Sequence, residues 1–179
     1  MKHWYVIYVK SRTEKKVLQS LSSKHIEVWL PVQNELRQWS DRKKLTEMPR
    51  FPGYLFVCVG RNEYDRVLTT EHVVCYITIG GKAVPVRDEV IRSLKRVLQQ
   101  DQVQVELSRD DLVPGGEVEI LSGPLMGVRG ELVRLKGKHK VSICIRQIHY
   151  TVMIEVPVTE LALIRAPRAA GHQLPVAGR

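Results

Sequence analysis

The chain has 179 residues, of which 44% are hydrophobic and 26% are charged, a composition typical of a folded globular protein and not of a disordered one. Its longest apolar runs, such as residues 4–9 and 54–59, are far shorter than the ~20 residues that a membrane span needs, and its N-terminus lacks the small-residue cleavage site of a signal peptide. The three cysteines lie far apart, which argues against a disulfide framework or a zinc site and favours a reducing cytoplasm.

The positive charge is concentrated in the first half of the chain. Residues 1–100 contain 18 Lys and Arg against 10 Asp and Glu, whereas residues 101–179 contain 10 against 9. This asymmetry favours a polyanionic partner for the first half and a different partner for the second. An ordinary solubility role is the alternative that charge alone leaves open.

The first half begins with alternating strand and helix patterns. Aromatic and β-branched residues predict a strand over 3–10. The helical spacing of apolar residues over 12–24 predicts a helix with a basic outer face. A second strand is expected over 26–32, and the loose alternation over 33–48 favours an extended hairpin.

A nearly continuous apolar run follows this hairpin. Residues 54–59 have the length and composition of a strand in the centre of a sheet. After it we expect a short helix over 61–69, a strand over 73–79 that ends in a turn at Gly80-Gly81, and an amphipathic helix over 87–100. The first hundred residues are therefore predicted to form an α+β domain, in which helices pack on an antiparallel sheet.

The composition changes after residue 100. Residues 101–113 are polar, slightly acidic and without a clear period, and we expect a linker there. Five short strands with glycines at their corners then predict a small all-β barrel over residues 114–165. Residues 166–179 lack periodicity and are expected to form a flexible tail.

The sharpest motif, "GGEVEILSGPLMGVRGELVRL" (115–135), lies at the start of this second domain. Its alternating apolar residues are expected to point inward, a Gly-Pro pair to turn the chain, and two later glycines to permit a positive φ or a close backbone approach. The residues of the pattern are Gly116, Val118, Ile120, Gly123, Pro124, Gly127 and Gly130. The run is strongly similar to the KOW motif, which implies an SH3-like barrel that binds ribosomal RNA or proteins.

The first half carries a second resemblance. The stretches "WYVIYVKSRTEKKV" (4–17) and "PRFPGYLFV" (49–57) resemble the N-terminal domain of the NusG family of transcription elongation factors. Together with the KOW motif, the resemblance covers residues 3–165. It implies an N-terminal domain that binds the clamp helices of RNA polymerase, and a KOW domain that recruits Rho, the ribosome or an antitermination factor.

A charged hairpin separates the chain from the housekeeping member of that family. The stretch "LRQWSDRKK" (36–44), shortly before "PRFPGYLFV", resembles the specialised RfaH and UpxY-type antiterminators, and the UpxY type accompanies surface-polysaccharide operons. The resemblance therefore implies an operon-specific antiterminator. The housekeeping NusG factor and a ribosome-associated KOW RNA-binding protein are the alternatives.

Aromatic side chains are the expected polymerase contacts. The positions that match residues at or beside the clamp-helix cavity of RfaH are Tyr8, Phe51, Tyr54 and Phe56, and Pro52 belongs to the same set as the residue that shapes the entry of the strand. Large flat side chains give a wide contact area for little lost rotamer entropy. For Phe56, a place in the core is an equally good interpretation.

A basic group near the end of the first strand is the expected nucleic-acid contact. Its members are Lys10, Arg12, Lys15 and Lys16. The group fits the phosphates of the exposed non-template strand, in an interaction that salt weakens, and a solvated helix face is the alternative. By the same resemblance, Trp4 is expected to stack on an unpaired base.

The hairpin extends this nucleic-acid prediction. Arg42, Lys43 and Lys44 are expected to contact nucleic acid beside the docked domain. Trp39 either anchors the hairpin to its own domain or contacts the transcription complex. The segment "NEYDRV" (62–67) stands where RfaH has an H-T-T stretch that reaches the far side of the cleft, so that contact is not expected here.

No catalytic set is recognisable in the sequence. The histidines are scattered, and residues 80–86 lack the ending of a phosphate-binding loop. We therefore expect a binding protein and not an enzyme, without a metal or a cofactor. The expected partners are RNA polymerase, non-template DNA or nascent RNA, and a ribosomal protein or antitermination factor for the KOW domain. The protein is expected in the cytoplasm as a monomer, with no membrane partner.

Overall fold

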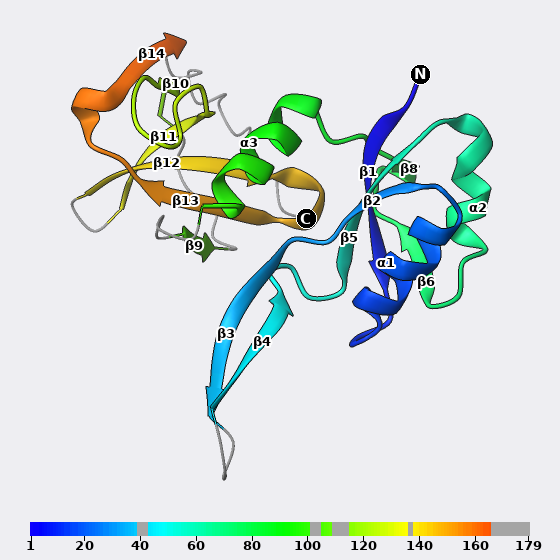
Figure 1. Ribbon diagram of the computed structural model, residues 1–179. Helices are drawn as coiled ribbons and strands as arrows, with labels where there is room; N and C mark the ends of the chain where they lie inside the picture. Colours follow the sequence, from blue (N-terminus) through cyan, green and yellow to red (C-terminus); the bar gives the residue numbers. More distant parts are fainter. Residues whose placement is uncertain (39–42, 101–104, 109–114, 136–137, 166–179) are drawn as a thin grey trace, which may run out of the picture.

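The computed structural model describes residues 1–38, 43–100, 105–108, 115–135 and 138–165. A mixed helix and strand region in the first half is followed by an all-β region in the second, and the helix α3 (Asp88–Leu98) lies between them (Figure 1). This arrangement confirms the predicted fold class. Within the described residues, no helix has the length and apolar character to cross a membrane.

The N-terminal sheet is antiparallel and has the strand order β2-β5-β1-β6. Its strands are β1 (His3–Val9), β2 (Glu27–Trp29), β5 (Tyr54–Val59) and β6 (Val73–Tyr76). The position of β5 between β1 and β2 confirms its predicted central place. Because successive side chains of a strand point to opposite faces, the uninterrupted apolar run of β5 supplies a core residue to each face of the sheet in turn.

Helices cover both faces of this sheet. The helices α1 (Glu14–Ser23) and α2 (Tyr64–Leu68), with a single 3-10 turn (Arg61–Glu63) before α2, bury Val17, Leu21 and Val67 on one face. The helix α3 buries its apolar stripe on the opposite face, beside Trp4 and Val6. The expected amphipathic helices over 12–24 and 87–100 are therefore confirmed.

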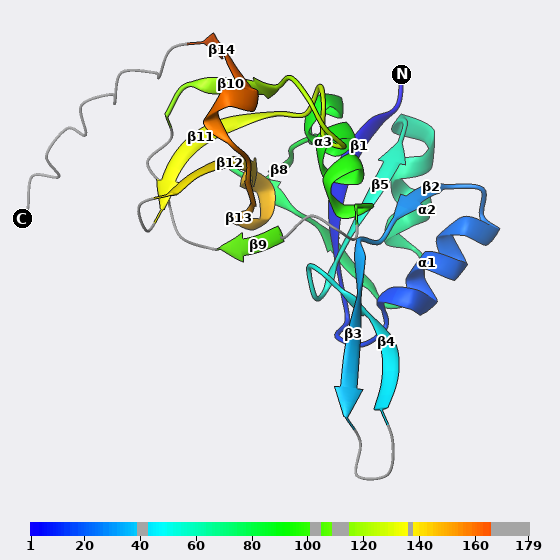
Figure 2. The same cartoon turned by 60° about the vertical axis from the view of Figure 1, so that its left-hand side comes forward.

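A two-stranded hairpin extends away from the rest of the molecule (Figures 1 and 2). It consists of β3 (Val32–Gln38) and β4 (Lys43–Pro49), which pair in antiparallel register. This confirms the hairpin expected over 33–48. The strand expected over 26–32 is shorter than predicted, because β2 ends at Trp29 and β3 leaves the sheet to pair only with β4.

The strand expected over 73–79 is divided in two. β6 stays in the N-terminal sheet, whereas β7 (Thr78–Ile79) pairs with β8 (Lys82–Ala83) around the expected turn at Gly80-Gly81. Between them, the N–H of Ile77 donates to the carbonyl of Val6. The apolar run predicted one strand, but its last residues, β7, pair with β8 and not with the N-terminal sheet.

The C-terminal sheet is antiparallel and has the strand order β14-β10-β11-β12-β13-β9. Its strands are β9 (Val105–Ser108), β10 (Glu117–Ile120), β11 (Arg129–Leu135), β12 (Lys138–Ile145), β13 (Tyr150–Glu155) and β14 (Leu161–Arg165). Two 3-10 turns, Arg146–Ile148 and Val158–Glu160, lie before β13 and β14. The five strands expected after residue 114 are present as β10 to β14.

The strand β9 lies inside the stretch for which a linker was expected, residues 101–113. Val105 pairs with Ile154 and Leu107 with Val152 of β13, so this part of the stretch is an edge strand of the C-terminal sheet. Two alternating apolar residues among polar neighbours are too short a pattern to predict a strand. The remaining boundaries of the predicted linker, and the tail expected over 166–179, lie outside the described residues.

The residues of the KOW-like motif have the burial and backbone geometry that the pattern predicts. Val118 and Ile120 are 2% and 1% exposed, so the alternating residues point inward. Gly127 has a φ of +81°. Gly130 serves a close approach instead, because a Cβ atom on it would lie 2.6 Å from the carbonyl oxygen of Ser142 on β12.

Replacing Gly130 by alanine is expected to destabilise the C-terminal sheet by about 1–3 kcal/mol, because β11 and β12 would have to separate to admit the methyl group. Chemical denaturation measures this loss. Gly60→Ala is the matched control, since the nearest atom to a Cβ at Gly60 would be 3.7 Å away. An unchanged unfolding midpoint for Gly130→Ala would show that the sheet has room at this position.

Candidate functional site

The four aromatic residues of the expected polymerase contact lie together on one face of the N-terminal sheet. Tyr8 and Tyr54 are directly opposite each other on β1 and β5, with ring centroids 5.5 Å apart. Phe51 precedes β5, and its ring is 6.2 Å from that of Phe56. The turn through Pro52, which is exposed, brings Phe51 back over the strand.

Exposure separates these rings into two kinds. Tyr8 is 40% exposed and Tyr54 is partly buried, whereas Phe51 and Phe56 are 0% exposed. Phe56 is buried within its own domain, where its ring centroid lies 5.2 Å from that of Trp29. Its place is therefore in the core, and Tyr8 and Tyr54 are the members that reach the surface.

Phe51 is covered by the C-terminal sheet. The ring of Tyr150, the first residue of β13, lies 5.2 Å from Phe51 and 6.5 Å from Tyr54, edge-on to both. Nothing in the sequence pattern singled out Tyr150. Phe51 is therefore not accessible to a partner in this arrangement.

The helix α3 contributes further contacts between the two halves. The guanidinium of Arg96 donates to the carbonyl of Met126, in the loop between β10 and β11. The side-chain amide of Gln147 donates to the carbonyl of Pro85, just before α3, at 3.0 Å. A single apolar core runs from the N-terminal sheet through α3 into the C-terminal sheet, so the two halves pack as one body in this structure.

The basic group lies where β1 ends and α1 begins. Lys10, Arg12, Lys15 and Lys16 are all exposed. Lys15 forms an ion pair of 3.0 Å with Glu47 of β4, which links α1 to the base of the hairpin. Among the described residues, the other three make no ion pair, so their charges face solvent and are available to an anion.

Trp4 has a less accessible place than its expected role requires. It is 7% exposed, and the ammonium of Lys95 on α3 lies 4.5 Å from the centre of its ring. The same ammonium is 5.6 Å from the ring of Trp29. A cation over an indole face is an attractive contact, so Lys95 would have to move before a base could stack on Trp4.

The basic residues of the hairpin are only partly described. Lys43 and Lys44 belong to β4, opposite Gln38 and Arg37 of β3, and their side chains lie outside the described part. Arg42 and Trp39 lie wholly outside the described residues. The roles expected for these four residues therefore stay predictions.

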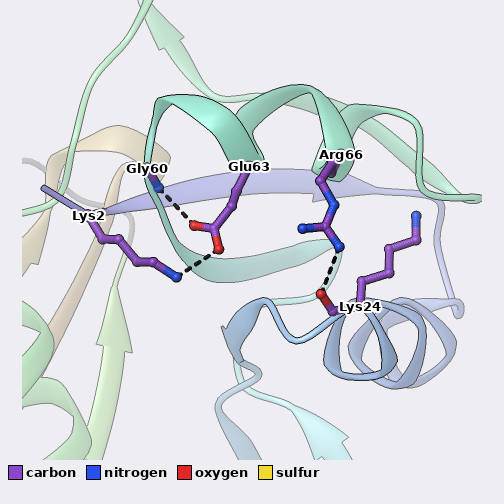
Figure 3. A network of polar contacts seen from close by, with 5 residues as sticks. All are labelled: Lys2, Lys24, Gly60, Glu63 and Arg66. Carbon is purple, nitrogen blue, oxygen red and sulfur yellow. Dashed lines mark hydrogen bonds and ion pairs between the residues drawn. The ribbon is translucent and has the colours of Figure 1, made fainter.

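The segment 62–67 makes its polar contacts within its own domain (Figure 3). The carboxylate of Glu63 accepts hydrogen bonds from Lys2 at 2.7 Å and from the backbone of Gly60 at 3.1 Å, and these bonds lower its pKa. Arg66 donates to the carbonyl of Lys24 at the end of α1, at 3.0 Å. These two side chains tie the segment to the domain.

The thiol of Cys58 is buried on β5, and this burial raises its pKa, with the neighbouring carboxylate of Glu27 adding to the effect. Cys75 and Cys144 are exposed. Within the part of the chain that the structure describes, no three His, Cys, Asp or Glu side chains gather as metal ligands would.

Comparisons with known proteins find similar chains. A family model described as "Transcription termination factor nusG" matches residues 2–95, more than half of the chain. The chain is 27% identical over 162 residues to the transcription termination/antitermination protein NusG of Pasteurella multocida, covering 80% of this chain and 86% of that protein. It is 24% identical to the NusG protein of Halalkalibacterium halodurans, covering 91% and 99%.

A solved structure described as "Domain interaction in Thermotoga maritima NusG" is also similar. It is 26% identical to this chain, covers 92% of it and 98% of its own length, and has a TM-score of 0.45.

Proposed function

The chain belongs to the NusG family of transcription factors, and from this premise we propose that it is an operon-specific elongation and antitermination factor that binds RNA polymerase at the clamp helices. The observation that carries this proposal is the Tyr8–Tyr54 pair. The pair lies in the part of the chain that the family model covers, and Tyr8 is 40% exposed. The protein acts by binding and not by catalysis.

The basic group supports contact with nucleic acid at the same end of the sheet. Lys10 and Arg12 follow the strand that carries Tyr8, and Lys16 lies in the first turn of α1. A domain that docks on polymerase through Tyr8 therefore brings three solvent-facing cations to the adjacent DNA. Their attraction to phosphates is electrostatic and independent of sequence.

The hairpin supports the specialised role. It extends well beyond the sheet and helices (Figure 2) and so can reach nucleic acid that the body of the domain does not contact. We propose that this hairpin takes part in selecting the operon. The C-terminal sheet engages a ribosomal protein or an antitermination factor, and its exposed apolar residues Leu121, Met126 and Leu163 support a protein partner.

Chromatin immunoprecipitation of the protein across its genome tests this proposal. Occupancy of one or a few operons is expected for a specialised antiterminator. Occupancy of most transcribed genes would instead identify the housekeeping factor. Retention on ribosomes without any polymerase association would favour an RNA-binding protein that acts through its KOW-like domain.

Neutralising Arg42, Lys43 and Lys44 to glutamine together is expected to weaken antitermination while leaving the fold intact. For single-stranded nucleic acid, the plot of log affinity against log salt has a negative slope, and each lost phosphate contact makes it less steep by about 0.7. Binding of the transcription complex over a range of salt concentrations measures this slope. The matched control is the triple change of Arg134, Arg146 and Arg165 to glutamine. It alters the net charge equally, at three exposed positions of the C-terminal half. Full activity of the hairpin variant would show that the hairpin is only a solvated loop.

A further inference from the structure

The carboxylate of Glu14 is buried, which is rare for a glutamate without a partner. Glu14 is the first residue of α1 and is 7% exposed. One of its oxygens accepts a hydrogen bond of 2.9 Å from the backbone N–H of Gly53, 39 residues further along the chain. This side chain therefore ties the start of α1 to the turn between β4 and β5.

That turn is flanked by two of the aromatic residues, Phe51 and Tyr54. The carbonyl of Gly53 accepts a hydrogen bond of 2.9 Å from the N–H of Val9. The turn is therefore bonded both to α1, through Glu14, and to the end of β1, through Val9. Gly53 has a φ of +81°, which glycine adopts without strain. A Cβ atom at this position would lie 2.9 Å from Cε2 of Tyr8.

The Tyr8 ring therefore lies directly against the glycine that Glu14 holds. Tyr8 and Tyr54 are cross-strand neighbours, and Tyr54 begins where the turn ends. A displacement of Gly53 would remove the backbone against which the Tyr8 ring packs. It would also shift the start of β5, where Tyr54 lies. Glu14 lies in the first turn of α1, where a side-chain acceptor faces the helix N-terminus, and its oxygen bonds instead to the Gly53 N–H of the turn.

We infer that Glu14 is a positioning residue for the polymerase contact: it fixes the Gly53 turn and, through it, the arrangement of the Tyr8–Tyr54 pair. This inference rests on the proposed function, because the pair is the proposed contact. The helix α1 then serves the interface twice. It contributes basic residues to the nucleic-acid side, and its first residue sets the geometry of the aromatic side.

The affinity of full-length variants for core RNA polymerase tests the inference, at a temperature where circular dichroism shows each variant folded. Glu14→Ala leaves the Gly53 N–H without its acceptor and is expected to bind at least about tenfold more weakly. Glu14→Gln keeps an acceptor oxygen and is expected to stay within about threefold of the parent. Val17→Ala, one helical turn further along the same buried face, destabilises α1 without touching the turn and is expected to keep its affinity.

Two results would overturn the inference. If Glu14→Ala loses no more affinity than Val17→Ala, Glu14 only stabilises the fold. If Glu14→Ala binds more tightly, its effect runs through the cover that Tyr150 places on Phe51 and not through the contact pair.

A second measurement keeps the inference testable if the parent chain fails to bind polymerase, an outcome that would refute the proposed function alone. In the NMR spectrum, Glu14→Ala is expected to shift the Gly53 amide signal together with the ring signals of Tyr8 and Tyr54, and Glu14→Gln is expected to restore the ring signals. Unmoved tyrosine rings in Glu14→Ala would contradict the positioning role.

Discussion

Replacing Tyr150 by alanine is expected to raise the apparent affinity for RNA polymerase by about ten- to a hundredfold. Tyr150 packs against Phe51 and Tyr54 and is 8% exposed. Removing a buried ring costs about 3–5 kcal/mol of packing, which here includes packing between the two halves of the chain. A chain that binds polymerase only when Tyr150 is away from Phe51 and Tyr54 has its affinity reduced by the fraction of molecules in that form. Removing the Tyr150 ring is therefore expected to raise the affinity.

Surface plasmon resonance with immobilised core polymerase measures this change. Tyr150→Phe keeps the ring and is expected to behave as the parent chain does. Ile154→Ala removes a buried side chain four positions further along the same strand, β13, and controls for a general loss of stability in the C-terminal sheet. An unchanged or lower affinity for Tyr150→Ala would show that the aromatic face is not the polymerase contact, or that the ring does not restrict access to it.

Replacing Phe56 by alanine is expected to destabilise the N-terminal sheet by about 3–5 kcal/mol. Phe56 is 0% exposed and lies on β5, which has a strand on each side, and its ring contacts those of Trp29 and Phe51. Because β5 is paired on both sides, the sheet is expected to relax only partly into the space that the ring leaves. This expected cost separates Phe56, as a core residue, from the exposed members of the aromatic set.

Chemical denaturation followed by tryptophan fluorescence measures the loss, since Trp4 and Trp29 belong to or pack against the same core cluster. Tyr8→Ala is the comparison, and because Tyr8 is 40% exposed it is expected to lose only about 1 kcal/mol. If Phe56→Ala unfolds at nearly the same denaturant concentration as the parent, the ring is not part of the core. Phe56 would then be a candidate for direct contact with polymerase.

The sequence predicts well the elements that have either a continuous apolar run or a strong internal period. The run 54–59 coincides with β5, because it is apolar throughout and Gly53 and Gly60 bound it. The spacing of apolar residues over 87–100 predicts the helix α3. β9 is not predictable from the sequence, because two apolar residues are too few to show a period. Its formation depends on pairing with β13, which is distant in the chain.

The candidate site was predictable only in part. Its aromatic and basic members lie on predicted elements or next to one another in the chain, so pattern and resemblance locate them. The contact of Tyr150 with Phe51 joins residues almost a hundred positions apart, and such a contact leaves no periodic trace. Glu14 looks like an ordinary first-turn acid in the sequence, and only the fold shows that its carboxylate binds the Gly53 amide. Likewise, nothing local indicates that Lys95 covers Trp4.

The affinity of the full-length chain for core RNA polymerase, measured with and without the clamp helices, tests the central claim most directly. We expect saturable binding to the intact polymerase that is lost when the clamp helices are deleted. Substituting the exposed residue of the contact pair, Tyr8→Ala, is expected to weaken that binding without unfolding the protein. Equal binding to both forms of the polymerase, or no binding to either, would contradict the proposal that this aromatic face is the polymerase contact.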